Sequence, residues 1–501
     1  MKKYIFLAMS AAVLGFTSCS DDSMDEANKN YKNPPAELVS AHLQITDAIM
    51  ATAFATVSGD YAFYTSTLTE QEFGTGNNQL MKAELRNRSE LGAASTFNNV
   101  WNSTYANLLN IKEMMDKVEN GTANSVGMYD VLGAAQVLWA INFGILTDLH
   151  GDVPYTQALQ GAANMTAAPD SQESIYKDII ATCDKAIENL TKGAKQKNMA
   201  NVDIAYHGDA SKWLAAAYAV KARYLIHQTC VDDQAAAKAL EAANKAKELG
   251  FEGLLVSEFN GVTCDNPWSA FVWSRKYTAP SKTVVDLMGA DDPRLGLYCY
   301  GEDAEDVAAV PGDDDKAKES STWCYPAYYD LGSQPVHIMS AHELYFILAE
   351  AELRTGADAT EDFQKAVALS VDEQSEWAAA LGNEFEFTTT GKAYAASLGK
   401  PDLKSVFQQK YIAGVVDEQV ETYNDIRRCM GMGENYITLT NPNNTQGNMN
   451  CWPYLLPYGQ SSLVSNPGLS KIAGDGTYIY EKQCWLFGTT TATLVLCASF
   501  A

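Results

Sequence analysis

Helical periodicity of the hydrophobic residues constrains the fold of this 501-residue chain more than any other feature. Within residues 100–118, apolar side chains recur every three or four positions, which predicts an amphipathic α-helix. Residues 128–148 are apolar on more than one side, so we expect that helix to be buried from several directions. The same period predicts further helices at residues 172–190, 210–228, 233–249, 341–354 and 360–369. The chain should therefore be mainly α.

Two pairs of these helices, in residues 212–250 and 343–368, resemble tetratricopeptide units. Both pairs carry small residues where two helices would cross, which allows the helix axes to approach closely. These residues are Ala216, Ala219, Ala239, Ala243, Ala246, Ala349, Ala351, Gly356 and Ala366. About 34 residues per helical pair is typical of the tetratricopeptide architecture. We expect a tetratricopeptide-like helical scaffold, and a plain helical bundle is the alternative.

Stretches without helical period separate the helical blocks. Residues 253–277 and 297–332 are rich in Gly, Asp, Tyr and Trp, and residues 430–468 contain many turn signals. We expect these inserts to form an irregular, loop-rich lobe that carries short strands and is held by the scaffold. The expected boundaries, within one domain of residues 36–501, are about 36–250 and 335–430 for the scaffold and about 251–334 and 431–501 for the lobe.

Residues 1–18 have the pattern of a signal peptide. Lys2 and Lys3 precede an apolar stretch at residues 4–16, whose helical length of about 20 Å is too short to cross a hydrocarbon core of about 30 Å. The tripeptide before Cys19 resembles a bacterial lipobox, so we expect cleavage before Cys19 and lipidation of its thiol. Residues 19–35 are polar and should form a flexible tether. An ordinary secretory signal with an incidental cysteine is the alternative.

The charge balance and the missing motifs exclude several classes of function. The chain has 62 acidic and 36 basic side chains, a net charge of -26, and no basic stripe that would bind nucleic acid. His342 and Glu343 begin a zinc-protease pattern, but Phe346 occupies the position of its second histidine. The sequence contains no nucleophile elbow and no complete dinucleotide-binding loop. We therefore expect no enzymatic activity, no cofactor and no nucleic-acid partner.

A more specific resemblance begins at residues 145–161, which read ILTDLHGDVPYTQALQG. A helix followed by Gly-Asp-Val-Pro-Tyr is similar to a hallmark of the SusD/RagB family of outer-membrane nutrient-binding lipoproteins. Further segments resemble the family in the same order along the chain. They are residues 171–180 (SQESIYKDII), 206–223 (YHGDASKWLAAAYAVKAR), 291–295 (DDPRL), 340–353 (SAHELYFILAEAEL), 409–412 (QKYI) and 423–428 (YNDIRR).

The resemblance implies a lipoprotein that is anchored in the outer membrane by its lipid and faces the cell exterior. It also implies capture of a glycan or oligosaccharide and its delivery to a SusC-like TonB-dependent transporter. Capture of a peptide is the alternative within the family. A different class of function is a tetratricopeptide-like surface scaffold that holds no nutrient. Asp21 and Asp22, just after the predicted lipidation site, resemble the surface-export signal of Bacteroidetes lipoproteins.

Aromatic residues in the irregular inserts are the candidates for ligand contacts, because sugars stack on aromatic rings and accept hydrogen bonds from planar polar groups. An early loop is a further candidate, since members of the family often contribute to their site from this part of the chain. The candidates are Phe73, Asn77 and Asn78 in the early loop, Trp268, Trp273 and Tyr277 in one insert, and Trp323, Tyr325, Tyr328 and Tyr329 in the other. For each ring, the alternative is that it fills the core of its own lobe.

Other prominent residues are expected to be structural. We expect the tryptophans of the helical segments to lie in the core and the charged residues of the family-like segments to pin loops to helices by charge-assisted hydrogen bonds. The tryptophans are Trp101, Trp139, Trp213 and Trp377, and the charged residues are Asp148, Asp152, Arg294, Arg427 and Arg428.

We predict no metal site, although the run Asp313, Asp314 and Asp315 is a weak calcium candidate because calcium is bound by several oxygen ligands. The run lacks the residue order of an EF-hand, and a solvated acidic loop is the alternative. The chain ends in an uncharged stretch at residues 486–501, which is too short for a membrane span. We expect its removal to leave the fold intact.

Overall fold

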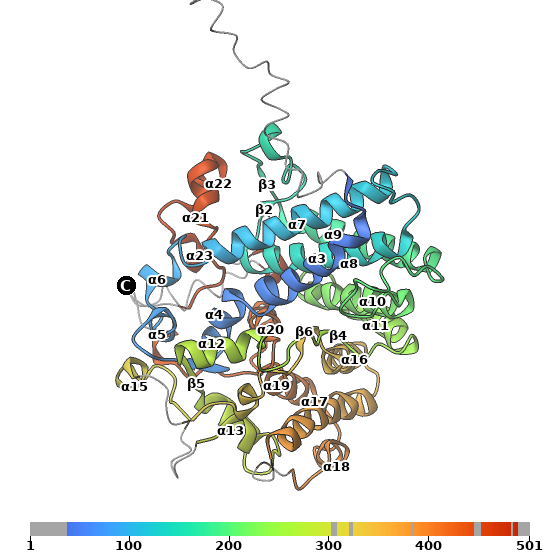
Figure 1. Ribbon diagram of the computed structural model, residues 1–501. Coiled ribbons are helices and arrows are strands. Elements are labelled where there is room, and N and C mark those ends of the chain that lie inside the picture. Colours follow the sequence, from blue (N-terminus) through green and yellow to red (C-terminus); the bar gives the residue numbers. More distant parts are fainter. Residues whose placement is uncertain are drawn as a thin grey trace, which may run out of the picture.

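The computed structural model describes residues 38–301, 308–319, 324–382, 385, 387–444, 452–481 and 484–488. Helices dominate this part of the chain and pack around a long central core (Figure 1). The predicted signal peptide, Cys19 and the tether lie outside the described residues, as does Trp323.

The first half of the chain forms long helices joined by short connections. Its helices are α3 (Ile45–Ala51), α4 (Asp60–Leu68), α5 (Gln79–Glu84), α6 (Arg88–Leu91), α7 (Asn98–Glu119), α8 (Tyr129–His150), α9 (Gln172–Lys192), α10 (Ala210–Ile226) and α11 (Ala235–Glu248). Its strands are β1 (Glu72–Gly74), β2 (Val153–Pro154) and β3 (Pro169–Asp170).

The second half mixes long helices with short ones. Its helices are α12 (Pro267–Arg275), α13 (Lys282–Met288), α14 (Leu295–Tyr298), α15 (Asp314–Lys318), α16 (Ala341–Thr355), α17 (Thr360–Leu381), α18 (Gly391–Ser397), α19 (Leu403–Ala413), α20 (Gln419–Met432), α21 (Gln460–Ser465), α22 (Pro467–Ala473) and α23 (Tyr478–Glu481). Its strands are β4 (Leu254–Val256), β5 (Thr278–Pro280) and β6 (Val336–Met339).

The long helices predicted from hydrophobic periodicity are confirmed as α7 to α11, α16 and α17. The prediction is too short for α17, which continues to Leu381 instead of ending at residue 369. The second half of α17 buries Val371, Trp377 and Ala378. The polar run at residues 372–376 lies between these side chains, and it hides the helical period in the sequence.

The paired helices stack in the manner of tetratricopeptide repeats. The pairs α8–α9, α10–α11 and α16–α17 are joined to one another by contacts of α9 with α10 and of α11 with α16 (Figure 1). The alanines predicted at the helix crossings are fully buried, which confirms that they permit close packing. They are Ala216, Ala219, Ala239, Ala243, Ala246, Ala349, Ala351 and Ala366. Gly356 instead ends α16 with a left-handed φ of 83°.

Short antiparallel strand pairs tie distant segments together. Within the described residues, β1 pairs with β5, β2 with β3, and β4 with β6. The β1–β5 pair attaches the predicted loop-rich lobe to the first helices, since Phe73 lies opposite Ala279. The main cluster of buried hydrophobic residues also runs from Ala41 to Phe487. The division into scaffold and lobe stays a prediction.

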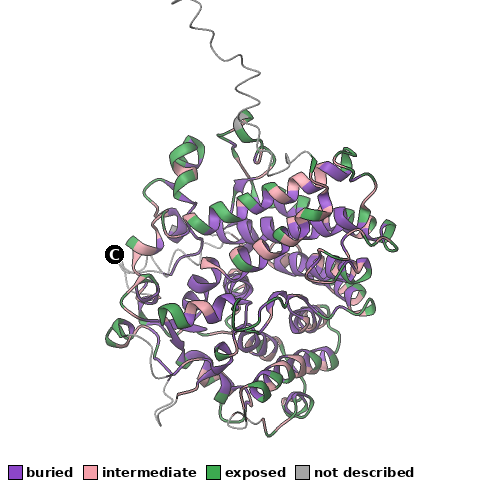
Figure 2. Cartoon of the chain, in the orientation of Figure 1, coloured by how far each residue is buried: buried purple, intermediate pink, exposed green. Residues whose placement is uncertain are grey.

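Helix α8 lies at the centre of this core. By length and composition it could cross a membrane, but 94% of its most apolar window is buried inside the protein. Figure 2 shows it as buried over nearly its whole length. Its polar side chains are satisfied internally, as for Asn142, whose Nδ2 donates to the Leu138 carbonyl at 2.8 Å. The helix is therefore buried from several directions, as predicted.

The Gly-Asp-Val-Pro-Tyr segment connects α8 to α9. Gly151 has a φ of 75°, a left-handed conformation that favours glycine. The Asp152 carboxylate accepts a hydrogen bond at 2.9 Å from the backbone N–H of Gln172, the first residue of α9. The negative charge also favours this helix N-terminus. The structural role predicted for Asp152 is confirmed.

Buried charges hold α20 against the helical scaffold. Arg428 pairs with Glu350 of α16 at 2.8 Å and with Asp425 of its own helix at 2.6 Å. Arg427 donates to the backbone carbonyl of Asp148, at the end of α8, at 2.7 Å. All five side chains are buried, and such pairs are costly to break because one charge would remain without a partner. The predicted pinning role of Arg427 and Arg428 is confirmed.

Arg294 likewise pins the segment at residues 291–295 to a helix. It is fully buried, pairs with Asp292 at 2.6 Å, and donates to the Gln409 side chain of α19 at 2.7 Å. This loop is thereby fixed to α19, as predicted.

His227 links three helices at the centre of the scaffold. Its Nε2 lies 2.7 Å from Glu421 of α20, and its Nδ1 lies 3.4 Å from Asp148 of α8. Burial alone lowers the pKa of His227, but the carboxylates of Glu421 and Asp148 raise it to about 9. The imidazole is therefore protonated at neutral pH and acts as the cation between two acids.

We predict a pH-dependent contribution of His227 to stability. Its folded-state pKa of about 9 lies above the ordinary value near 6.5, so the stabilisation is complete below about pH 6.5 and is lost as the pH rises through about 9. The difference in unfolding free energy between wild type and His227→Gln should fall by about 3 kcal/mol over this window. Urea unfolding from pH 6 to 10 measures it, with the exposed His207→Asn as control. A difference that is constant or grows with pH would contradict the assignment.

The first residues of the uncharged C-terminal stretch belong to the core. Leu486 and Phe487 are buried, and the backbone N–H of Leu486 donates to the Gln172 side chain at 2.9 Å. The Arg427 guanidinium lies 4.5 Å from the centre of the Phe487 ring. The expectation that residues 486–501 can be removed is therefore wrong for these two residues.

Replacing Phe487→Ala should lower the free energy of unfolding by about 3–5 kcal/mol, because it removes a buried ring and leaves a cavity. A chain ending after Gly488 retains this ring and should unfold at the wild-type urea concentration. Equal stability of Phe487→Ala and wild type would show that the ring contributes nothing to the core.

Candidate functional site

The candidate ligand-contacting residues fall into two groups, and one group is buried. Phe73 is 0% exposed and lies in a small core cluster with Ala279 and Ala317. Trp268 stacks on Tyr329 with ring centres 5.9 Å apart, and both rings are buried. Tyr328 packs against Tyr329 and is buried as well. For these four residues the structure shows the alternative reading, in which the ring fills the core of its lobe.

The second group forms an aromatic surface. Trp273 is 48% exposed, and the ring of Tyr325 meets it edge-on at a centroid distance of 5.3 Å. Tyr325 in turn contacts Tyr300, which contacts Phe385 at 4.8 Å. Tyr277 is half-buried and lies two residues beyond the end of α12, where its ring contacts Phe271 at a centroid distance of 6.2 Å. We call Trp273, Tyr300 and Tyr325 the aromatic surface.

The packing of helix α12 buries one of two nearby tryptophans and exposes the other. The Asn266 side chain caps its first turn by accepting the N–H of Trp268 at 2.9 Å, and Pro267 follows at the position where proline is favoured. Trp268 and Val272 are four residues apart and share the buried face. Trp273 is the next residue along the helix and points to the outside.

The early loop lies beside the end of α12. The backbone N–H of Thr75 donates to the carbonyl of Tyr277 at 2.8 Å, and a Cβ on Gly76 would lie 2.8 Å from the Tyr277 ring. Asn78 caps α5 by accepting the N–H of Leu80 at 2.9 Å, so its oxygen has a structural use. Asn77 is exposed and adopts a left-handed φ of 53°. The structure therefore brings the early loop and the first insert together.

The acidic run forms the start of α15. Asp313 caps this helix by accepting the N–H of Lys316 at 3.0 Å, and Asp314 pairs with Lys318. Asp315 is exposed. Two of the three carboxylates are thus used within the short helix, and the run stays an untested, weak candidate for calcium.

Within the described residues, one group of side chains has the spacing of a metal site, and it consists of Asp148, His227 and Glu421. The two carboxylates also have partners outside the group, since the Tyr176 hydroxyl donates to Asp148 and the Arg223 guanidinium lies 3.9 Å from Glu421. The group is therefore explained as a buried ion-pair network.

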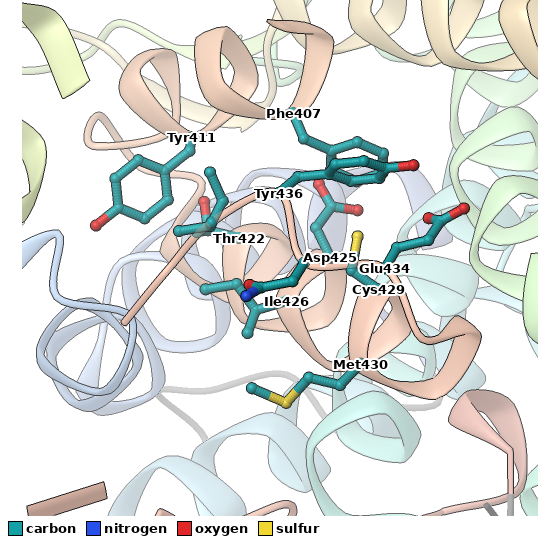
Figure 3. A pocket seen from close by; sticks show the side chains of 11 residues that line it. Phe407, Tyr411, Thr422, Asp425, Ile426, Cys429, Met430, Glu434 and Tyr436 are labelled. Atoms are coloured by element: carbon teal, nitrogen blue, oxygen red, sulfur yellow. The ribbon is translucent and has the colours of Figure 1, made fainter. Parts of the chain in front are cut away.

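A separate pocket of about 380 Å³, including its open mouth, lies between α19, α20 and the loop that follows α20 (Figure 3). Its wall includes the stacked rings of Phe407 and Tyr436, whose centres are 5.2 Å apart. Its acids already have partners, since Glu434 pairs with Arg354 and Asp425 with Lys410 and Arg428. This pocket offers rings but few unused polar groups, so it suits a polyhydroxylated ligand less well than the aromatic surface.

The aromatic surface combines the elements that a sugar requires. An exposed indole face can stack on a pyranose ring, and polar groups at its edge can bind hydroxyls. The Lys276 ammonium lies over the Trp273 ring, 5.9 Å from its centre. The sequence did not single out Tyr300, Phe385 or Lys276. Only the Tyr300–Tyr325 backbone bridge and the end of α12 bring these residues to Trp273.

Comparison with known proteins supports the same family as the sequence. The family model for SusD-like proteins, described as starch-binding and associating with the outer membrane, matches residues 41–458. A solved SusD/RagB family protein from Bacteroides thetaiotaomicron is 30% identical, with a TM-score of 0.80 over 90% of this chain and 100% of its own.

Two more distant structures support the fold. A SusD homologue from Bacteroides fragilis is 19% identical, with a TM-score of 0.69 over 90% of this chain and 100% of its own. A chitin-binding SusD homologue from Flavobacterium johnsoniae is 18% identical, with a TM-score of 0.65 over 90% of this chain and 99% of its own. Comparison with functionally curated proteins gives no significant match.

The family match spans most of the chain, and the tetratricopeptide-like scaffold agrees with it. The chain therefore belongs to the SusD/RagB family of outer-membrane-associated glycan-binding proteins.

Proposed function

We propose that this protein is a non-catalytic, cell-surface lipoprotein that captures a glycan or oligosaccharide and delivers it to a SusC-like TonB-dependent transporter. Lipidation of Cys19 anchors it in the outer membrane, and residues 19–35 tether the folded domain. Ligand binds at the aromatic surface.

The exposure of Trp273 carries this proposal. Trp273 is exposed by 48%, so a face of its indole is open to a pyranose ring. Tyr325 supports the indole from one side at 5.3 Å, which fixes its orientation before ligand arrives. A ring that is already oriented loses less conformational entropy when ligand binds. The rigid α12 therefore presents a ready stacking platform.

The similar proteins are in accord with a sugar ligand. The family description names starch binding, and one structural relative is described as chitin-binding. Both starch and chitin consist of pyranose rings, which have apolar faces suited to an indole.

Replacing Trp273→Ala should weaken binding of the cognate glycan by at least about 10-fold, because exposed tryptophans at binding sites often contribute more than about 2 kcal/mol. Affinity electrophoresis against a polysaccharide panel, followed by calorimetry on the best ligand, measures the change. Phe54→Ala is a matched control, since Phe54 is also exposed, by 47%, and lies on a different helix. Unchanged glycan binding by Trp273→Ala would contradict the site, and binding of peptides alone would contradict the ligand class.

Replacing Cys19→Ser should abolish incorporation of labelled fatty acid and release the protein from the outer membrane, since stable anchoring requires the acyl chains. The control is Cys264→Ser, which removes an exposed thiol in the folded domain. Co-purification of the wild type with a large β-barrel protein tests the transporter partner. A labelled and membrane-bound Cys19→Ser variant would contradict the anchor.

A further inference from the structure

The end of α12 carries an unusual residue for its conformation. Lys276 is the C-cap and has a left-handed conformation, with φ 55° and ψ 46°. Glycine is the common residue at such a helix end, because a side chain adds roughly 1–2 kcal/mol of strain there. The backbone N–H of Lys276 closes the helix by donating to Val272 at 2.8 Å. A strained lysine in place of glycine suggests that its side chain has a use.

That side chain lies at the aromatic surface. The Lys276 ammonium is 5.9 Å from the centre of the exposed Trp273 ring, and Arg275 is the preceding residue. Both basic residues are exposed. Among the residues that the structure describes, neither has a carboxylate within ion-pair distance, although the chain contains 62 acids and 36 bases.

Among the described residues, two acids near this surface have partners of their own. Asp330 accepts the hydroxyl of Tyr325 at 2.9 Å, and Asp314 of α15 pairs with Lys318. Glu72 is fully buried, and burial raises its pKa well above the ordinary value, which favours the uncharged carboxyl. Asp313 lies at the start of α15, beside the early loop, whereas Lys276 and Arg275 lie at the end of α12. The Lys276 ammonium thus adjoins the exposed indole.

We infer that the ligand of the aromatic surface is an acidic oligosaccharide, whose pyranose ring stacks on Trp273 and whose carboxylate or sulfate group is bound by Lys276. This inference rests on the proposed function and adds the chemical class of the sugar. Charge-assisted hydrogen bonds to the anion supply selectivity that stacking on an indole alone does not. They also offset the long-range repulsion of an anionic ligand by the net charge of -26.

Paired ligands test the inference. Oligogalacturonate and its methyl ester share one backbone and differ in charge, so they test a carboxylate. Chondroitin sulfate and desulfated chondroitin differ in the same way and test a sulfate. We expect wild type to bind at least one acidic ligand, and to bind oligogalacturonate about 10-fold more tightly than its ester if the anion is a carboxylate. Preference for chondroitin sulfate over desulfated chondroitin identifies sulfate as the anion.

Lys276→Gly removes the ammonium and relieves the left-handed strain, so the variant should fold at least as stably as wild type. It should lose about 10-fold in affinity for the preferred acidic ligand and less than about 2-fold for its neutral counterpart. Lys471→Gln, which removes an exposed lysine on α22, is the control and should change neither affinity.

The outcomes separate this inference from the proposed function. Binding of neutral glycans that depends on Trp273 but not on Lys276, with no preference for acidic ligands, overturns the inference and leaves the proposed function intact. Failure of all neutral and acidic glycans to bind overturns both. An acidic preference that persists unchanged in Lys276→Gly also overturns the assignment of the anion site.

Discussion

The buried charges around α20 are the interaction on which the rest of the structure depends. Arg428 joins α20 to α16 through Glu350, and His227 joins it to α8 and α10 through Asp148 and Glu421. Each charge has been removed from water, and only its partners compensate for the lost hydration. The helices are therefore held in one relative arrangement, because any shift between them would leave a buried charge unpaired.

This rigid arrangement determines where the loops lie. The β1–β5 pair attaches the early loop to the end of α12, and β4–β6 attaches the start of the insert to the entrance of α16. Trp268 and Tyr329 form the core beneath this region, so α12 cannot rotate without exposing them. Trp273 on the opposite face of α12 is consequently presented at a fixed position. The scaffold provides the rigidity, and the short helix provides the ligand-contacting ring.

The helices and their buried faces could be predicted from the sequence where hydrophobic periodicity was the dominant signal. The helical period of α7 to α11 was unambiguous, and the buried alanines at the crossings followed from it. Prediction from the sequence was inaccurate where burial depends on tertiary contacts. Trp268 and Trp273 were equivalent in the sequence, and only the packing of α12 made one a core residue and the other a surface residue.

The same limit applies to the other candidate residues. Phe73 and Tyr328 are buried, since strand pairing and the core of the lobe decide their environment. Tyr300 was missed because it reaches the aromatic surface through a backbone bridge to Tyr325, which no local pattern predicts. The strained conformation of Lys276 was equally invisible, because its sequence context contains no glycine or turn signal.

The most direct test of the account is a crystal structure of the protein with a bound oligosaccharide. The account predicts a pyranose ring stacked on the indole of Trp273, at a carbon-to-ring separation of about 4 Å, with polar contacts to the end of α12 and the early loop. A sugar bound in the pocket between Phe407 and Met430, with Trp273 left free, would contradict it.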